Sequence, residues 1–251
     1  MKINLSLACL LGASVLFAQN VLADGVKIRA GTSNNSYELN VTPSTGAGYN
    51  FASTTYTGTN FGVTFLTGDS TYIDIAASNG SGTYVRPTYA GDLARSDLAF
   101  VFGANLGSTS SSMGNLYVGY KTGETKLNPP TTAPSGSSHL NFKASGLVAG
   151  GGVIFPLGNA GALGLNLGLG LMSGKYDIHN NGTTTTTTYN ADYALGYSYG
   201  IGYSYPFTQN FGISLDYKAN SYTYTFNSGL TTENSLEEKF NSTVASLYVK
   251  F

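Results

Sequence analysis

Five leucines occupy every second position between residues 163 and 171, and glycine, asparagine or methionine stands between and after them. A period of two is typical of a β-strand, because successive side chains point to opposite faces of a sheet. At about 3.3 Å per residue and a tilt of about 40°, this face covers about 20 Å of height, close to the apolar band of about 25 Å that membrane-crossing strands present. We therefore expect these side chains to face lipid: Leu163, Leu165, Leu167, Leu169 and Leu171.

A second alternating segment runs from Tyr193 to Phe207, with large aromatic or aliphatic residues on one face and mostly glycine, serine or alanine on the other. Aromatic residues at both ends of an outward face favour interfacial girdles, built here from tyrosine and phenylalanine because the chain has no tryptophan. A soluble β-sandwich also alternates, but with its large residues inward. Alternation alone does not distinguish the two, so the chain ends decide the interpretation.

The last nine residues, Thr243 to Phe251, alternate up to a terminal phenylalanine. Leu247, Val249 and Phe251 share one face of this strand. The ending resembles the C-terminal signal of Gram-negative outer-membrane β-barrels, in which the closing strand is read by the barrel assembly machinery. The resemblance implies that these three residues form an assembly signal and that the assembly machinery is a partner.

The N-terminal residues have the pattern of a secretory signal peptide. Lys2 supplies a positive charge, Leu5 to Phe17 is mostly apolar, and small or aliphatic residues end at Ala23. The apolar run is too short for a transmembrane helix. We therefore predict a signal peptide over 1–23 and a single barrel domain over 24–251. The only cysteine, Cys9, lies in the predicted leader, so no disulfide or thiol chemistry is expected after cleavage.

The composition excludes two classes of protein. Charged residues make up 10% of the chain and the net charge is −1, so the basic surface that nucleic acid requires is missing. No apolar run of about 20 residues is present, so a helical membrane protein is also excluded.

Strand and turn patterns predict an all-β fold, a closed antiparallel up-and-down transmembrane β-barrel. Ten strands are expected, with eight or twelve as alternatives, at 25–42, 60–67, 71–78, 95–106, 116–127, 141–156, 162–178, 189–207, 210–226 and 240–251. Short turns should alternate with long polar loops at 79–94, 128–138, 179–188 and 227–238. Strands of 16 to 19 residues exceed the 9–11 or so that cross a bilayer, so the barrel should project beyond the outer leaflet.

Charges on the inward faces are the main candidates for function. Strand parity places Asp74, Lys121, Asp216 and Lys218 in the lumen at middle height. They would form either a constriction that selects small solutes or an internal cluster of ion pairs that plugs the barrel. Five more charges should point inward nearer the ends: Lys27, Arg29, Arg95, Asp97 and Asp192.

Inward glycines also admit two interpretations. They would either leave volume for a narrow channel or make room for inward aromatics. The candidate inward aromatics are Tyr222, Tyr224 and Tyr248.

The sequence gives little indication that this barrel is an enzyme. Asp177 and His179 resemble the Asp-x-His pair of the omptin proteases, but parity places both on the outward face and no second acidic pair lies opposite. His139, the other histidine, follows Ser137 and Ser138 in an expected loop. No metal-ligand or phosphate-binding spacing is found. We therefore expect a non-enzymatic protein with no catalytic residues, metal or cofactor.

The whole mature chain resembles small Gram-negative outer-membrane barrels of the OmpA, OmpW and porin-like group. This implies an outer-membrane location and contact with membrane lipid or lipopolysaccharide, with a monomer as the default. The first hypothesis for function is a narrow channel for passive transport of small solutes. The alternative is a plugged structural or surface barrel that acts in adhesion or in lipopolysaccharide or host binding through its extracellular loops.

Overall fold

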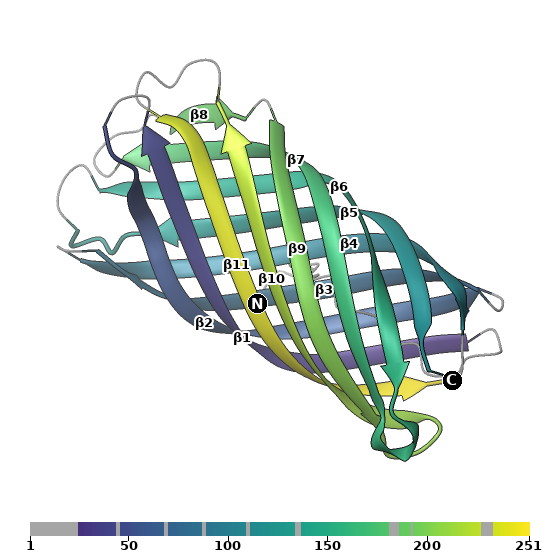
Figure 1. Cartoon of the computed structure of the whole chain (residues 1–251). Coiled ribbons are helices and arrows are strands. Elements are labelled where there is room, and N and C mark those ends of the chain that lie inside the picture. The colour runs from purple at the N-terminus through teal and green to yellow at the C-terminus, as the bar shows by residue number, and fades with distance from the viewer. Residues whose placement is uncertain are drawn as a thin grey trace, which may run out of the picture.

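The computed structural model contains a closed antiparallel barrel of ten strands with one additional short strand (Figure 1). It describes residues 25–43, 46–67, 70–86, 89–108, 111–133, 137–180, 186–191, 193–226 and 233–251. The elements are β1 (Gly25–Pro43), β2 (Tyr49–Thr67), β3 (Thr71–Val85), β4 (Ala90–Ser108), β5 (Met113–Asn128), β6 (Ser138–Pro156), η1 (Gly158–Ala160), β7 (Ala162–Asn180), β8 (Thr186–Asn190), β9 (Tyr193–Pro206), β10 (Phe211–Thr225) and β11 (Glu233–Lys250). Across these ranges, no helix is both long and apolar enough to span a membrane.

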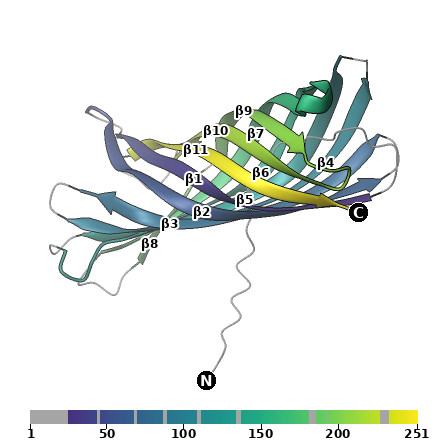
Figure 2. The same cartoon turned by 90° about the horizontal axis from the view of Figure 1, so that it is seen from below.

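Apart from the short strand β8, each strand pairs with the strands before and after it in the chain, and β1 closes the barrel by pairing with β11 (Figures 1 and 2). The short strand β8 pairs with β7 from Lys175 upward, whereas β9 pairs with β7 from Met172 downward. β8 therefore continues along the same edge of β7 as β9, toward the loop end, and the predicted number of ten barrel strands is confirmed.

The closed sheet is staggered, which sets the tilt of the strands and the width of the lumen. Paired residues can be followed around the barrel through Arg29, Gly62, Ala76, Ala99, Lys121, Gly146, Met172, Ala194, Tyr224, Leu236 and Val41. The path returns to β1 twelve residues beyond its start, at position 41 instead of 29. With ten strands, this stagger corresponds to a tilt of about 40°.

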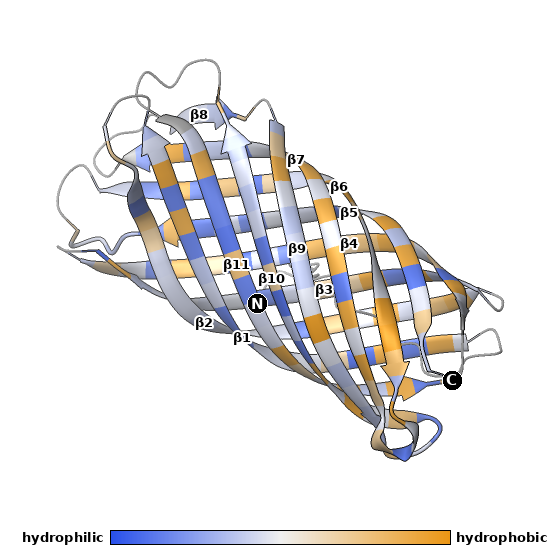
Figure 3. Ribbon diagram, in the orientation of Figure 1, coloured by the Kyte–Doolittle hydropathy of each residue, from blue (hydrophilic) through white to orange (hydrophobic). Residues whose placement is uncertain are grey.

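The outer surface carries an apolar band at one end of the barrel, the end with the short turns, Gly25 and Phe251. We call this the turn end and the opposite end the loop end. The five predicted lipid-facing leucines lie on the outer face of β7, and Leu167 and Leu169 are 69% and 72% exposed. Figure 3 shows hydrophobic residues recurring along β7, and hydrophilic residues on β11 toward the loop end. That the outer leucines contact lipid stays a prediction.

The pattern is inverted in the half of the barrel near the loop end. There the outer face is polar, as on β1 above Ala30 and on β2 above Phe61, where Thr32 and Thr59 begin the polar stretch. The inner face carries buried apolar side chains such as Leu39 and Leu127. Apolar inside and polar outside is the arrangement of a barrel surrounded by water, so this half fits the predicted projection from the membrane.

Four predicted strand boundaries are wrong, all near the loop end. β2 begins at Tyr49 instead of residue 60, and β11 begins within the predicted loop 227–238. β3 extends to Val85 and β4 begins at Ala90, both within the predicted loop 79–94. These segments have polar outer faces, so their polar composition resembled that of loops although their inner faces are apolar. The predicted leader 1–23 and Asp192 lie outside the described residues.

Replacing Leu167 with arginine should destabilise the barrel by about 2–4 kcal/mol, because the charge would lie near the middle of the apolar band. Ser173→Arg is the matched control on the same face of β7 but above the leucines, with an expected cost of about 0–1 kcal/mol. Urea unfolding in lipid vesicles measures both. Equal effects of the two substitutions would contradict the proposed position of the band.

Candidate functional site

The interior of the barrel is the candidate functional site, and it has two layers. Buried charged residues lie in the half nearer the turn end and in the middle, and an apolar core lies toward the loop end. Each layer is built by inward positions of many strands, because alternate side chains of every strand point into the lumen.

The first charged cluster joins β1 to β3 across β2. The Arg29 guanidinium donates to both oxygens of Asp74, at 2.9 Å to Oδ1 and 2.8 Å to Oδ2. Thr64 on β2 donates to Asp74 Oδ1 at 2.9 Å and accepts from Arg29 Nη1 at 3.0 Å. Bidentate geometry with a bridging hydroxyl partly offsets the cost of removing both charges from water.

The second charged cluster centres on Arg95 of β4. Its guanidinium donates to Asp97 at 2.9 and 2.8 Å, to the Thr125 hydroxyl at 2.7 Å, and to Glu238 of β11. β3, β2 and β1 lie between β4 and β11 in the sheet, so the contact with Glu238 crosses the lumen. The guanidinium carbon also lies 4.7 Å from the centre of the Phe240 ring. Arg95 therefore connects β4 with β11 across the lumen.

The four predicted members of the charge cluster all lie on inward positions of the lumen, but they are distributed between different contacts. Asp74 pairs with Arg29, whereas Lys121 Nζ lies 3.7 Å from Asp97 Oδ1. Asp216 accepts a hydrogen bond of 3.1 Å from Ser214, and Lys218 is partly buried two residues further along β10. The ion pairs of these inward charges lie within the Arg29 and Arg95 clusters, and the charges do not form a single ring. Their role in function stays a prediction.

Sequence reasoning missed Glu238, because it placed this residue at the end of a loop. The available signal was the alternation of Leu236, Glu238 and Phe240, which share the inner face of β11. Arg95 and Asp97 were predicted to point inward, but nothing in the sequence indicated that Glu238 would meet them.

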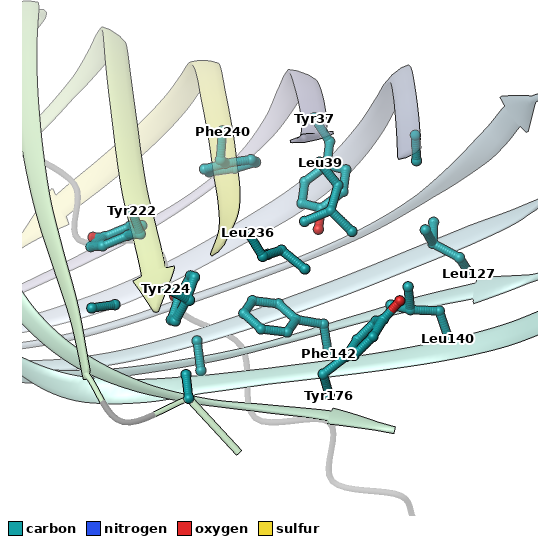
Figure 4. Close-up of a cluster of buried hydrophobic side chains, with 14 of the residues drawn as sticks. Tyr37, Leu39, Leu127, Leu140, Phe142, Tyr176, Tyr222, Tyr224, Leu236 and Phe240 are labelled. Carbon is teal, nitrogen blue, oxygen red and sulfur yellow. The ribbon is translucent and has the colours of Figure 1, made fainter. Parts of the chain in front are cut away.

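The apolar layer is a cluster of buried side chains that point from the surrounding strands toward one another inside the barrel (Figure 4). The ring of Phe142 packs edge-on against Tyr224 with 4.8 Å between centroids, and Tyr224 has no exposed surface. Every barrel strand contributes at least one buried side chain, in chain order Tyr37, Tyr56, Tyr84, Leu93, Leu127, Phe142, Tyr176, Ala194, Tyr224 and Leu236. We call these ten residues the plug. The plug side chains are buried and pack closely against one another at this level.

Inward glycines make the space that inward tyrosines occupy. A Cβ atom at Gly196 would overlap the Tyr222 ring, and one at Gly212 would overlap the Tyr248 ring. A Cβ at Gly174 would lie 2.6 Å from Cδ1 of Tyr224. At these positions the structure confirms the interpretation that glycine accommodates inward aromatics.

The remaining candidates lie on the outer surface. Leu247 and Val249 are exposed on the outer face of β11, the strand that closes the barrel against β1, and the exposed Phe251 follows directly after it. Their role as an assembly signal stays a prediction. Asp177 and His179 also lie on outward positions of β7, as parity predicts. In the described part of the chain, no group of three histidine, cysteine or acidic residues is arranged to hold a metal ion.

No family model and no curated protein matches the sequence. Solved structures with a similar fold are Gram-negative outer-membrane β-barrels. The toluene transporter TodX of P. putida is 10% identical, with 91% of each chain covered and a TM-score of 0.39. Neisserial surface protein A is 12% identical, with 90% of this chain and 97% of that chain covered and a TM-score of 0.38. The translocator domain of the autotransporter NalP from Neisseria meningitidis is 10% identical, with 90% and 88% covered and a TM-score of 0.47. Such values do not transfer a function to this chain.

Gly174→Ala should destabilise the barrel by about 1–3 kcal/mol, because the new methyl group overpacks the plug against Tyr224. The same substitution in a Tyr224→Ala background should cost far less, since the neighbouring ring is gone. Equilibrium unfolding of the two single variants and the double variant measures the coupling. Additive effects would show that Gly174 is not needed to make room for Tyr224.

Asp74→Ala should cost about 3–5 kcal/mol, because it leaves the Arg29 guanidinium buried without its carboxylate. The double variant Arg29→Met/Asp74→Leu should recover much of that loss, since both charges are removed together. Lys126→Ala is the control, because its ion pair with Glu124 is solvent-exposed and should contribute at most about 1 kcal/mol. Urea unfolding in vesicles compares the three variants, and a double variant as unstable as Asp74→Ala would contradict the pairing.

Proposed function

We propose that this protein is a non-enzymatic outer-membrane β-barrel that lacks an open solute path and acts as a surface protein through its projecting loop end. The observation that carries the proposal is the plug, which receives side chains from all ten barrel strands. The contact between Arg95 and Glu238 adds a cross-lumen connection just below it.

The outer surface supports the membrane placement. Exposed leucine, phenylalanine and tyrosine side chains surround the barrel near the turn end, where the lumen is charged. Apolar outside and polar inside is the arrangement of a barrel in lipid. Long loops are extracellular in such barrels and short turns periplasmic, so the loop end would face outward.

The projecting half supports a role at the cell surface. Nineteen-residue strands such as β7 are about twice as long as a bilayer requires. Their outer face near the loop end carries ion pairs, among them Lys143 with Glu124 at 3.4 Å and Lys239 with Glu237 at 3.0 Å. This charged, projecting wall is the surface that another cell, a host molecule or lipopolysaccharide would meet first.

The narrow channel predicted from the sequence is the second candidate. Polar residues near the turn end favour it, since Arg29, Asp74 and Asp216 line the lumen at that level. Transport of solutes through the whole barrel would require the plug to open. The packing of Phe142 against Tyr224 favours the surface protein over the channel.

Conductance of the refolded protein in a planar bilayer tests the proposal. The wild-type barrel should be silent, whereas Phe142→Ala/Tyr224→Ala/Leu236→Ala should conduct, because three large plug residues are removed. Protease protection and heat-modifiable migration on gels establish that both forms are inserted and folded. Steady wild-type conductance would overturn the proposal. A silent triple variant would show that the plug is not the barrier.

A further inference from the structure

The sequence contains only two histidines, and the barrel brings them together. His139 near the start of β6 pairs directly with His179 near the end of β7, although 40 residues separate them. Their ring centroids are 6.0 Å apart, with an angle of 50° between the rings. Both side chains are partly exposed on the outer face, so an ion from solvent can reach them.

This spacing fits one metal ion held between two imidazoles. Zinc lies about 2.0–2.1 Å from each ligating nitrogen, which places the two ring centroids about 5–6 Å apart. Residues directly opposite each other on antiparallel strands have Cβ atoms about 4.5–5.5 Å apart, so the backbone needs no rearrangement to bring the rings to one ion.

Neighbouring side chains orient the pair and add negative charge. His139 Nδ1 lies 3.2 Å from Asn128 Oδ1, and a ring that donates there keeps its lone pair on Nε2. Outer-shell hydrogen bonds of this kind fix the tautomer of metal-binding histidines. Asp177 lies one outward position below His179, and a hydrogen bond from Thr188 holds the pKa of that carboxyl below its usual range.

Lysines limit the negative charge around the pair. Lys175 forms an ion pair with Asp177 at 3.3 Å, and Lys143 lies opposite Lys175 on β6. The carboxylate is therefore partly neutralised, and the two imidazoles must supply most of the binding. Imidazole ligands suit zinc, copper and nickel, whereas magnesium and calcium prefer oxygen ligands.

We propose that His139 and His179 form a binding site for a late first-row divalent cation such as Zn²⁺ at the loop end of the barrel, with water completing the coordination. The ion joins the loop-end portions of β6 and β7 on the outer face. The site lies about 20 Å above Leu171, the last outward leucine of β7, and is therefore above the apolar band.

Calorimetric titration of Zn²⁺ into the refolded chain 24–251, produced without an affinity tag, tests the site. This chain contains no cysteine and no other histidine, so no thiolate or further imidazole competes for the ion. One Zn²⁺ should bind per barrel, and an excess of Mg²⁺ should not displace it. His139→Gln and His179→Gln should each weaken binding at least about tenfold, and Asn128→Ala should also weaken it.

Lys143→Gln is the matched control, because it changes a neighbouring outward residue without removing a proposed ligand. Its affinity for Zn²⁺ should stay at or above that of the wild type. Heat-modifiable migration checks that every variant is folded. Absence of Zn²⁺ binding by the wild type, or undiminished binding by either histidine variant, would overturn the proposal.

Discussion

Closure of the sheet between β1 and β11 is the constraint on which the rest of the structure depends. In lipid every strand must satisfy its backbone hydrogen bonds within the sheet, so an open edge is excluded. Ten strands closed with a stagger of twelve residues produce a lumen narrow enough for the Arg95 side chain to reach Glu238 on a distant strand. The same narrowness lets one side chain from each strand complete the plug.

The strands change their pattern of polar and apolar residues along the barrel axis. On β7 the outer face changes from Leu171 to Ser173 and Lys175, while the inner face goes from Asn166 to Met172 and Tyr176. Burial of apolar surface therefore favours lipid outside one half and a packed interior inside the other.

Buried ion pairs have a different role from the plug. Removing charges such as Arg29 and Asp74 from water is costly, so pairs of this kind contribute more to a defined arrangement than to net stability. Because β1, β2 and β3 must be in register for Arg29, Thr64 and Asp74 to meet, a slipped strand would leave charges unpaired. We infer that the charged clusters favour correct register, whereas the plug supplies much of the apolar burial.

Local alternation determined much of the fold. Side-chain direction along a strand depends only on parity, so the sequence by itself placed Leu167 outward and Asp74 and Tyr224 inward, and the spacing of such segments predicted ten strands. Contacts between strands were decided only by the tertiary structure. Arg95 meets Glu238 because closure brings β4 and β11 around one narrow lumen. His139 meets His179 because the register of the adjacent strands β6 and β7 pairs them. Polar segments such as 49–59 are strands because their inner faces join a shared core, a cause that lies outside the segments themselves.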